Sequence, residues 1–599
     1  MRQSHKAVAV LRVLCVHSVL AIGLTAQAQP GIAELDPVFF PPENPFSEEK
    51  RVLGKILFWD EQLSSDNTTS CGTCHIPAAG GTDPRIANNP GIDGMQNTLD
   101  DIRGSFGIVK SDSNDDYAVD ATFNLMRQIT GRSANSVINA TFADNIFWDG
   151  RATSQFIDPE TGAVAIASGG ALESQVVGPP VSDVEMAHIS RDWSEITKKM
   201  DSARPLALAT DLTPDQAAAI AASPTYAELF EDAFGDPAIT ARRIAFAIAT
   251  YERTLVSDES PWDDFVAGNT NALTPGQRQG WTIFQTARCD SCHTPPLFSD
   301  NQFRAIGVRP VEWDTGRMEV TGLFEDRGKF KTPGLRNSGL KRHFMHAGTF
   351  TTMNLAVGFY VGGPLFPENI DPFMAAVNLN AGQVPPLADF IANGLTDPRV
   401  ANETFPFDRP TLRSELPPNP MLIGPGSDNG SGFIPPMVAV TPPNLGNEGF
   451  KLGTTGMADG TTVSLYVSST APVMGAITPD SVEGPFVATT GVGVAASVTA
   501  HLPIPDNALL DGSTVFYQWV IDATGARSPV AAARLFCGTG TCSTPCLADT
   551  NHDGLVTPAD FSAWVSAFNT AAPECDQNGD GSCTPADFSA WVANFNAGC

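Results

Sequence analysis

Two motifs with the spacing Cys-x-x-Cys-His are the residues of this chain best suited to chemistry. They are Cys71-Gly72-Thr73-Cys74-His75 and Cys289-Asp290-Ser291-Cys292-His293. In such a motif the two thiols attach to haem vinyl groups, and the histidine that follows ligates the iron. A zinc site needs four ligands close together, and a redox dithiol does not need the trailing histidine, so both alternatives explain the pair poorly. The sequence predicts two c-type haems held by Cys71, Cys74, Cys289 and Cys292, with His75 and His293 as iron ligands.

The first 28 residues are typical of a secretory signal peptide. Arg2, Lys6 and Arg12 precede an apolar stretch, and Ala26-Gln27-Ala28 supplies a cleavage site of small residues. We therefore expect an exported protein that is periplasmic, on the cell surface or secreted. No later segment has about 20 consecutive apolar residues, so we expect no membrane span. The formal charge of −30 disfavours nucleic acid as a partner and would attract a basic electron donor.

Changes in composition predict a multidomain chain. The two haem regions are predicted to be mainly α cytochrome c-like domains. A stretch rich in Pro, Gly and Ser then marks a linker, and alternating polar and apolar residues at 461–467 and 514–520 predict a small antiparallel β-sandwich of immunoglobulin-like type. The predicted parts are a signal peptide (1–28), a first haem domain (29–270), a second haem domain (271–415), a linker (416–439), the β-sandwich (440–540) and a helical EF-hand-like module (541–599).

Local signals place several helices. Thr274-Pro275-Gly276-Gln277 has the pattern of a capping box with Pro in the first turn, which predicts the helix that delivers Cys289. Thr213-Pro214 and Ser223-Pro224 predict similar starts, and residues 241–255 carry apolar side chains at helical spacing.

The tail contains two copies of an acidic loop, 27 residues apart. Each copy has oxygen-bearing side chains at the first, third, fifth and twelfth positions and a backbone carbonyl at the seventh, which is the calcium-ligand pattern of an EF-hand loop. The predicted calcium ligands are Asp549, Asn551, Asp553, Leu555 and Asp560, then Asp576, Asn578, Asp580, Ser582 and Asp587. The repeat resembles dockerin modules, which implies calcium-dependent folding and a cohesin-like or cell-surface partner. The clustered Cys537, Cys542, Cys546, Cys575, Cys583 and Cys599 predict up to three disulfides, with their connectivity open.

Three stretches of residues 45–415 resemble the bacterial di-haem cytochrome c peroxidase and MauG superfamily. They are Leu57-Phe58-Trp59-Asp60, Phe147-Trp148-Asp149-Gly150-Arg151, and Thr332-Pro333-Gly334-Leu335-Arg336-Asn337 continuing to Met345-His346-Ala347-Gly348. The resemblance implies an oxidoreductase that reduces hydrogen peroxide with electrons from a small donor protein, a cytochrome c or a cupredoxin. It also implies that Glu185 moves the proton between peroxide oxygens, Gln175 positions water and peroxide, Pro179 lines the pocket, Trp148 lies between the haems, and Arg336 and His346 contact haem propionates.

Two departures from the family pattern bear on the iron ligands. No histidine lies between His75 and His188, so the removable histidine that caps the peroxide haem in several relatives is missing. That haem would then be five-coordinate, with Met126 as the competing sixth ligand. At the second haem, the family spacing points to Tyr360, as in MauG, while Met353 is the nearby alternative.

The family also holds a calcium ion between its haem domains, through an Asn that follows an Arg. Here Ser133 follows Arg132, while Lys341 and His343 would supply the carbonyls. Three other functions compete with the peroxidase. They are a MauG-like oxidase that acts on a protein or organic substrate through a high-valent iron state, a non-enzymatic electron carrier, and a scaffold-bound protein whose function lies in the tail.

Overall fold

The computed structural model describes residues 34–538 except 86, 92, 97 and 99, and in the tail residues 548, 550–551, 557–570, 572–578 and 582–597. The predicted signal peptide, the predicted calcium ligands Asp549, Asp553, Leu555 and Asp580, and Cys542, Cys546 and Cys599 lie outside these residues. Within the described ranges, no helix combines the length and the apolar character needed to cross a membrane.

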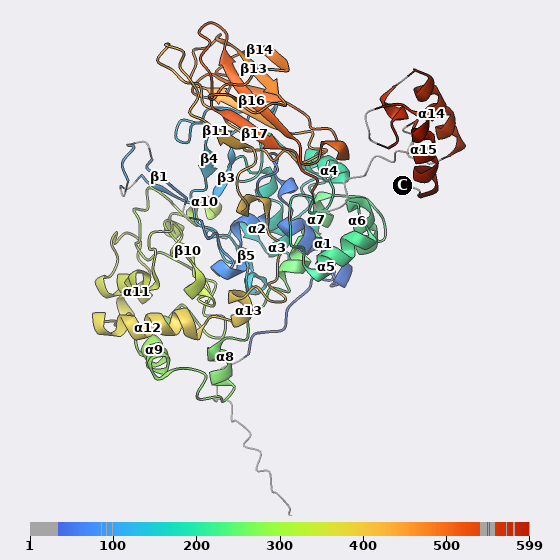
Figure 1. Ribbon diagram of the computed structural model, residues 1–599. Helices are drawn as coiled ribbons and strands as arrows, with labels where there is room; N and C mark the ends of the chain where they lie inside the picture. The colour runs from blue at the N-terminus through green and yellow to red at the C-terminus, as the bar shows by residue number, and fades with distance from the viewer. Residues whose placement is uncertain are drawn as a thin grey trace, which may run out of the picture.

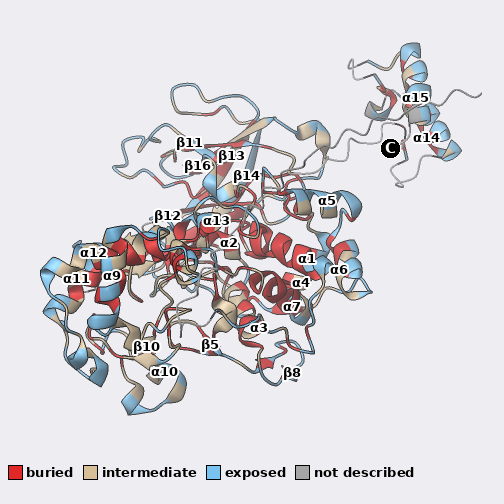
Figure 2. Cartoon of the chain, turned by 90° about the horizontal axis from the view of Figure 1, so that it is seen from below, coloured by how far each residue is buried: buried red, intermediate tan, exposed pale blue. Residues whose placement is uncertain are grey.

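The first haem region is built around two closely packed helices, α1 and α7, which are buried along most of their length (Figure 2). They pack closely because Gly54 of α1 has no side chain, and a Cβ there would fall 1.9 Å from the Ala247 carbonyl oxygen. The helices of this region are α1 (Glu48–Trp59), α2 (Cys71–Cys74), α3 (Ala171–Val176), α4 (Trp193–Ser202), α5 (Pro214–Ala222), α6 (Tyr226–Phe234) and α7 (Ala241–Glu252).

Much of the first haem region is not helical, because loops and two-stranded antiparallel pairs connect the helices. These pairs are β1 (Ala87–Asn89) with β2 (Ile102–Gly104), β3 (Phe106–Val109) with β4 (Arg127–Ile129), β5 (Asn145–Ile146) with β6 (Ala152–Thr153), and β7 (Phe156–Ile157) with β8 (Val164–Ile166).

The second haem region has its own aromatic core, formed by Trp262, Trp281, Phe284, Phe298 and Phe390. Its elements are α8 (Pro261–Val266), α9 (Pro275–Thr286), α10 (Met318–Thr321), α11 (Met353–Gly362), α12 (Val384–Asp389) and α13 (Pro398–Ala401), with β9 (Phe303–Arg304) paired to β10 (Phe330–Lys331). Figure 1 shows α9, α11 and α12 together at one end of the molecule.

The helix starts test the local predictions. Thr274 caps α9 and forms the expected capping box with Gln277, and Thr213 caps α5 with Gln216. The start at Ser223 is wrong, because Thr225 caps α6 instead, with Glu228 completing its capping box. The helix predicted over 241–255 ends at Glu252.

Residues 421–536, which we call the β domain, contain a five-stranded antiparallel sheet in the order β11-β17-β16-β13-β14 and a two-stranded pair, β12 with β15. Both contribute to one hydrophobic core, which includes Leu452, Leu465, Val498 and Trp519. The strands are β11 (Met421–Ile423), β12 (Lys451–Thr455), β13 (Thr462–Ser468), β14 (Ser481–Val487), β15 (Ser497–His501), β16 (Thr514–Ile521) and β17 (Val530–Arg534). The linker predicted over 416–439 is therefore wrong at 421–423, where an apolar triplet pairs with β17.

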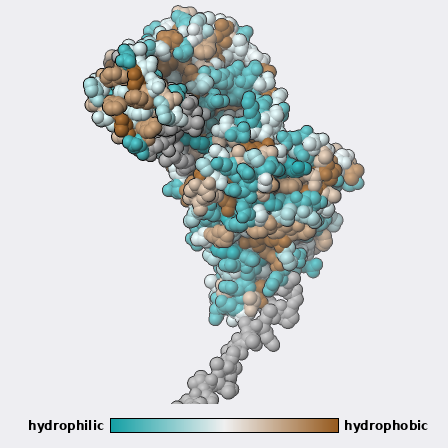
Figure 3. Space-filling model, turned by 90° about the vertical axis from the view of Figure 1, so that its right-hand side faces the viewer, coloured by the Kyte–Doolittle hydropathy of each residue, from teal (hydrophilic) through white to brown (hydrophobic). Residues whose placement is uncertain are grey.

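The described part of the tail contains two helices of equal length, α14 (Pro558–Thr570) and α15 (Pro585–Ala597), one from each sequence repeat. They pack through equivalent aromatic residues, with Phe561 5.1 Å from Trp591 and Trp564 5.6 Å from Phe588 between ring centroids. Cys575 and Cys583 form a disulfide, in keeping with the prediction for this cysteine cluster. Hydrophilic residues are spread over the face of the molecule in Figure 3, with hydrophobic patches between them.

Candidate active site

The first Cys-x-x-Cys-His motif is held by the end of α1. Ser70 caps the short helix α2 and forms a capping box with Thr73, which fixes the start of the motif. Gly72 lies against the indole ring of Trp59, and a Cβ at this position would fall 2.1 Å from the ring. The Leu-Phe-Trp-Asp stretch thus positions the motif through packing.

His75 has the orientation expected of an iron ligand. Its Nδ1 lies 3.1 Å from the Gly81 carbonyl oxygen, so Nδ1 carries the proton that this hydrogen bond needs. Burial lowers the pKa of His75, which keeps the imidazole neutral and leaves the Nε2 lone pair for a metal. The thiols of Cys71 and Cys74 are not in disulfides, and both line the adjoining cavity. These residues fit a covalently attached haem.

The cavity beside His75 brings the predicted catalytic residues together. Its wall includes Cys71, Cys74, His75, Trp148, Gln175, Pro179 and Glu185. Gln175 comes from α3 and Pro179 from the turn that follows, whereas the haem motif comes from a distant part of the chain. The fold therefore assembles these residues around one space.

Glu185 is half-buried and has a cation nearby. Its backbone N–H donates to the Ser182 carbonyl oxygen at 3.1 Å, which closes a turn at the cavity wall. Burial raises the pKa of Glu185, while Arg151 and the Ser182 hydroxyl oppose that rise. A carboxyl group with a raised pKa holds a proton more readily than an ordinary carboxyl group, which suits a proton shuttle.

The second motif lines a separate cavity, at the end of α9. Arg288 adopts a left-handed conformation with φ of 68°, which turns the chain out of the helix before Cys289. The Nδ1 atom of His293 lies 3.1 Å from the carbonyl oxygens of both Phe298 and Pro333. The Thr332-Pro333-Gly334 stretch thus orients this histidine, and the residues again fit an attached haem.

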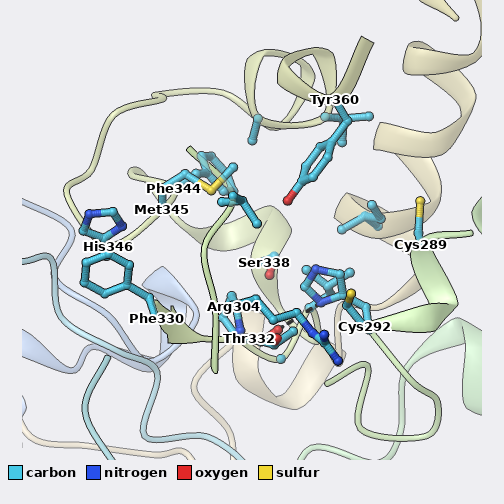
Figure 4. A pocket seen from close by; sticks show the side chains of 18 of the residues that line it. Cys289, Cys292, Arg304, Phe330, Thr332, Ser338, Phe344, Met345, His346 and Tyr360 are labelled. Carbon is cyan, nitrogen blue, oxygen red and sulfur yellow. Dashed lines mark hydrogen bonds between the residues drawn. The ribbon is translucent and has the colours of Figure 1, made fainter. Parts of the chain in front are cut away.

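Tyr360 of α11 lines the second cavity and is half-buried, and Figure 4 shows its hydroxyl oxygen pointing into the pocket. Burial and the nearby thiols of Cys289 and Cys292 raise its pKa, so a bound cation would be needed to favour the phenolate. Met353 lines the same cavity from the first turn of the same helix. Both predicted alternatives for the ligand therefore lie at this cavity.

Trp148 lies between the two cavities, since it lines both of them. Its indole Nε1–H donates to the Ser133 carbonyl oxygen at 2.8 Å, which fixes the ring. The ring also meets the imidazole of His346 edge-on, with centroids 6.3 Å apart. An aromatic ring in this position shortens the gap that electrons would have to cross.

Comparisons with known proteins agree with this arrangement. A sequence model described as Di-haem cytochrome c peroxidase matches residues 48–271. Cytochrome c551 peroxidase of Nitrosomonas europaea is 30% identical over 320 residues, which cover 53% of this chain and 73% of the relative. The chain belongs to the di-haem cytochrome c peroxidase family.

Two other relatives in the di-haem peroxidase family have similarly low sequence identity to this chain. Cytochrome c peroxidase Ccp of Escherichia coli is 28% identical over 361 residues, covering 58% of this chain and 62% of that protein. Methylamine utilization protein MauG of Methylorubrum extorquens is 28% identical over 326 residues, covering 54% of this chain and 71% of that protein. The family is thus matched through both its peroxidase and its MauG branches.

Two residues considered for haem contact lie away from the cavities: Met126, the alternative to a five-coordinate first iron, and Arg336, the candidate for a propionate contact. Met126 does not line the first cavity, and 60% of its side chain is exposed, because it sits at a turn facing solvent. Arg336 lines neither cavity, since its guanidinium forms a two-pronged ion pair with Asp263 at 2.7 Å and its Nε donates to Pro296. Neither residue therefore lines the cavity beside which it was considered.

His346 does line the second cavity, as its predicted propionate contact requires. It stacks on Phe330 with ring centroids 3.6 Å apart, at the end of the pocket away from the two cysteines (Figure 4). Burial lowers its pKa to about 3, and its Nε2 atom has no hydrogen-bond partner. An unpartnered buried ring nitrogen fits a polar group supplied by a bound cofactor.

The stretch where the family pattern has a calcium ion, and where this chain lacks the Asn ligand, is joined by direct hydrogen bonds. The Ser133 hydroxyl donates to the Met345 carbonyl oxygen at 2.9 Å, and the Ser133 N–H donates to the His346 carbonyl oxygen at 2.8 Å. Burial lowers the pKa of the Lys341 side chain to about 8. The calcium contact predicted for this residue would use its backbone carbonyl oxygen instead. Serine therefore bridges the domains where the family pattern has an Asn ligand.

The tail loops are partly described. The carboxylates of Asp560 and Asp587, the twelfth residues of the two loops, each accept backbone N–H bonds from their own loop, including those of Asn551 and Asn578. Among the described residues, no three acidic, His or Cys side chains lie close enough to hold a metal ion.

Sequence reasoning missed Glu252, which ends α7 and lines the first cavity. Only 3% of it is exposed, and its Oε2 atom has no hydrogen-bond partner. Burial raises its pKa to about 8, although Arg253 opposes this. One acidic residue in an apolar helix gives no signal that distinguishes it from a solvated one.

Proposed function

We propose that this protein is an exported di-haem peroxidase, in which one hydrogen peroxide, two electrons and two protons give two water molecules. The electrons would come from a small redox protein of the cytochrome c or cupredoxin type. The observation that carries the proposal is the single cavity wall that joins Cys71, Cys74 and His75 with Gln175 and Glu185. The relatives named as cytochrome c peroxidases support it.

Each of the predicted functional residues at the first cavity has a proposed role. A haem held at His75 would supply the iron that binds peroxide and assists its cleavage. Glu185 would take the proton from the near peroxide oxygen and return it to the far one, for which its raised pKa is suited. Gln175 would hold peroxide and water by its amide, and Pro179 would keep part of the wall apolar. Trp148 would carry electrons between the cavities.

Replacement of the proton shuttle tests this function. In Glu185→Gln, the carboxamide keeps the size of the side chain but cannot shuttle a proton, so peroxide cleavage should fall by roughly 100-fold or more. Both haems should remain attached, which the optical spectrum of the denatured protein reports. Glu231→Gln, at an exposed position of α6, is the control and should keep full turnover with reduced cytochrome c. Intact activity in Glu185→Gln would refute the assignment.

A MauG-like oxidase is the second candidate, and the position of Tyr360 favours it. A tyrosinate ligand would lower the potential of the second haem, which disfavours rapid electron entry from a donor protein. In Tyr360→Met the potential of that haem should rise by tens to hundreds of millivolts, the expected sign for Met ligation. If Tyr360→Met oxidises an organic substrate less but accepts electrons from cytochrome c faster, the oxidase is favoured. An unchanged potential would instead point to Met353 as the ligand.

We also propose finer features for the remaining parts. Residues 541–599 would form a dockerin-like module that binds two calcium ions, since Asp560 and Asp587 occupy equivalent positions in matching loops. A cohesin-like or cell-surface protein would be its partner. The two sheets of the β domain, which share one core, support the predicted immunoglobulin-like sandwich.

A further inference from the structure

The β domain is attached to the first haem domain by a buried lysine. Lys451, on β12, is fully buried, and its ammonium donates to the Ser111 hydroxyl at 3.0 Å and to both the backbone and a carboxylate oxygen of Asp115 at 2.6 Å. The same ammonium lies 4.4 Å from the centre of the Tyr117 ring. A buried cation with this many partners costs desolvation unless all of them stay in place, so it fixes residues 111–117 against the β domain.

Main-chain contacts extend this attachment. The Tyr117 N–H donates to the Thr499 hydroxyl at 2.7 Å, and the Ser497 hydroxyl donates to the Tyr117 carbonyl oxygen at 2.7 Å. Further along, the Val494 N–H donates to the Val119 carbonyl oxygen at 2.9 Å. An apolar cluster joins Val109, Tyr117, Val119 and Leu125 of the haem domain to Val438 of the β domain.

Residues 106–129, which carry these contacts with the β domain, also contact the turn that contains Glu185. β3 lies directly against residues 184–185, because a Cβ at Gly107 would fall 1.8 Å from the Val184 carbonyl oxygen. The Gln128 side chain, on β4, donates to the Asp183 carbonyl oxygen at 2.7 Å. The Ile189 N–H donates to the Ser111 carbonyl oxygen at 3.0 Å. Residues on both sides of Glu185 are therefore held by residues 106–129, which are bound to the β domain.

The segment between β3 and β4 is held internally by short turns alone. It contains no helix, and between the paired strands Phe106–Val109 and Arg127–Ile129 its backbone forms two isolated bridges, Ser111 with Tyr117 and Asp120 with Asn124. A loop of this length normally loses order unless other contacts restrain it. Phe106 and Gly107 line the first cavity together with Glu185, so disorder in the segment would reach the cavity wall.

We propose that the β domain acts as a brace for the peroxide site, which positions Glu185 through residues 106–129, with Lys451 as the principal positioning residue. This inference rests on the proposed function only in that Glu185 is taken as the proton shuttle. It assigns the β domain a role inside the enzyme, in contrast to a binding module carried at the end of a linker.

The test uses the full-length protein with both haems attached. Lys451→Met keeps the apolar stem and removes the ammonium. Hydrogen exchange of the backbone amides should accelerate by at least about tenfold at residues 109–125 and also at 183–189. Turnover with peroxide should fall by about tenfold, and the acid limb of its pH profile should shift, while the KM for the electron donor stays constant. Arg534→Met removes a cation from an exposed position of the same domain and should change none of these quantities.

A second variant protects the test against misfolding. Thr499→Val removes the hydroxyl that accepts the Tyr117 N–H and keeps the volume on β15, so the same changes should occur at several-fold magnitude. If residues 109–125 exchange faster in both variants but 183–189 do not, or if neither region changes, the brace is refuted. If both regions exchange faster but the wild-type protein has no peroxidase activity, the brace stands and the proposed function fails.

Discussion

Glu252 gives the sharpest quantitative prediction, because its carboxyl group is buried without a partner for Oε2. Its pKa is about 8 in the folded protein, against an ordinary value of 4.5. Above pH 4.5 the unfolded chain releases this proton while the folded chain retains it, so the unfolded state binds fewer protons. The free energy of unfolding should therefore fall by about 1.4 kcal/mol per pH unit, and the fall should stop near pH 8.

The measurement compares the wild type with Glu252→Gln, which has no group to titrate at this position. Between about pH 5.5 and about pH 7.5, the wild type should lose about 3 kcal/mol of stability relative to the variant. Urea unfolding followed by circular dichroism at several pH values gives this difference. The exposed Glu231→Gln variant is the control and should run parallel to the wild type. A difference between wild type and Glu252→Gln that does not change with pH would refute the reasoning.

Three further predictions follow from other contacts. Gly72→Ala should abolish haem attachment at the first motif, seen as a halved haem stain, since the new Cβ would lie 2.1 Å from the Trp59 ring; full attachment would contradict this packing argument. Glu173→Gln breaks a fully buried ion pair with Arg253, so the free energy of unfolding should drop by about 3–5 kcal/mol. Urea titration measures this difference, and a loss below about 1 kcal/mol would be inconsistent with a buried ion pair. Chelation of calcium should reduce the helical circular dichroism of the full-length protein, and the loss should be absent from a chain carrying Asp560→Ala and Asp587→Ala. An identical response of both proteins would argue against calcium in the loops.

Features written in short sequence motifs were predictable. His75, His293, Glu185 and Trp148 each sit in a contiguous pattern whose spacing carries its chemistry, and all four line the cavities. The capped start of α9 was also predictable, because a capping box involves residues only three positions apart.

Features that depend on residues far apart in the sequence could not be predicted. Arg336 was assigned to a cofactor, but its partner Asp263 lies 73 residues earlier in the chain. The strand at 421–423 was predicted as linker because it is formed by pairing with a distant strand, Met421 with Ala532, and no local sequence signal reports such a pairing. The contact of Lys451 with Asp115 spans 336 residues, so the role of the β domain emerges only in three dimensions.

The hydrogen bonds of Ser133 across the two haem domains have a consequence for how the protein responds to its surroundings. A direct bond between serine and the carbonyl oxygens of residues 345 and 346 does not depend on the concentration of any ion. The spacing of the two redox centres should then stay constant in waters poor in divalent cations. Attachment of the tail to a scaffold would be the step that senses such cations, so the ionic environment would govern where the enzyme is anchored and leave its electron relay unchanged.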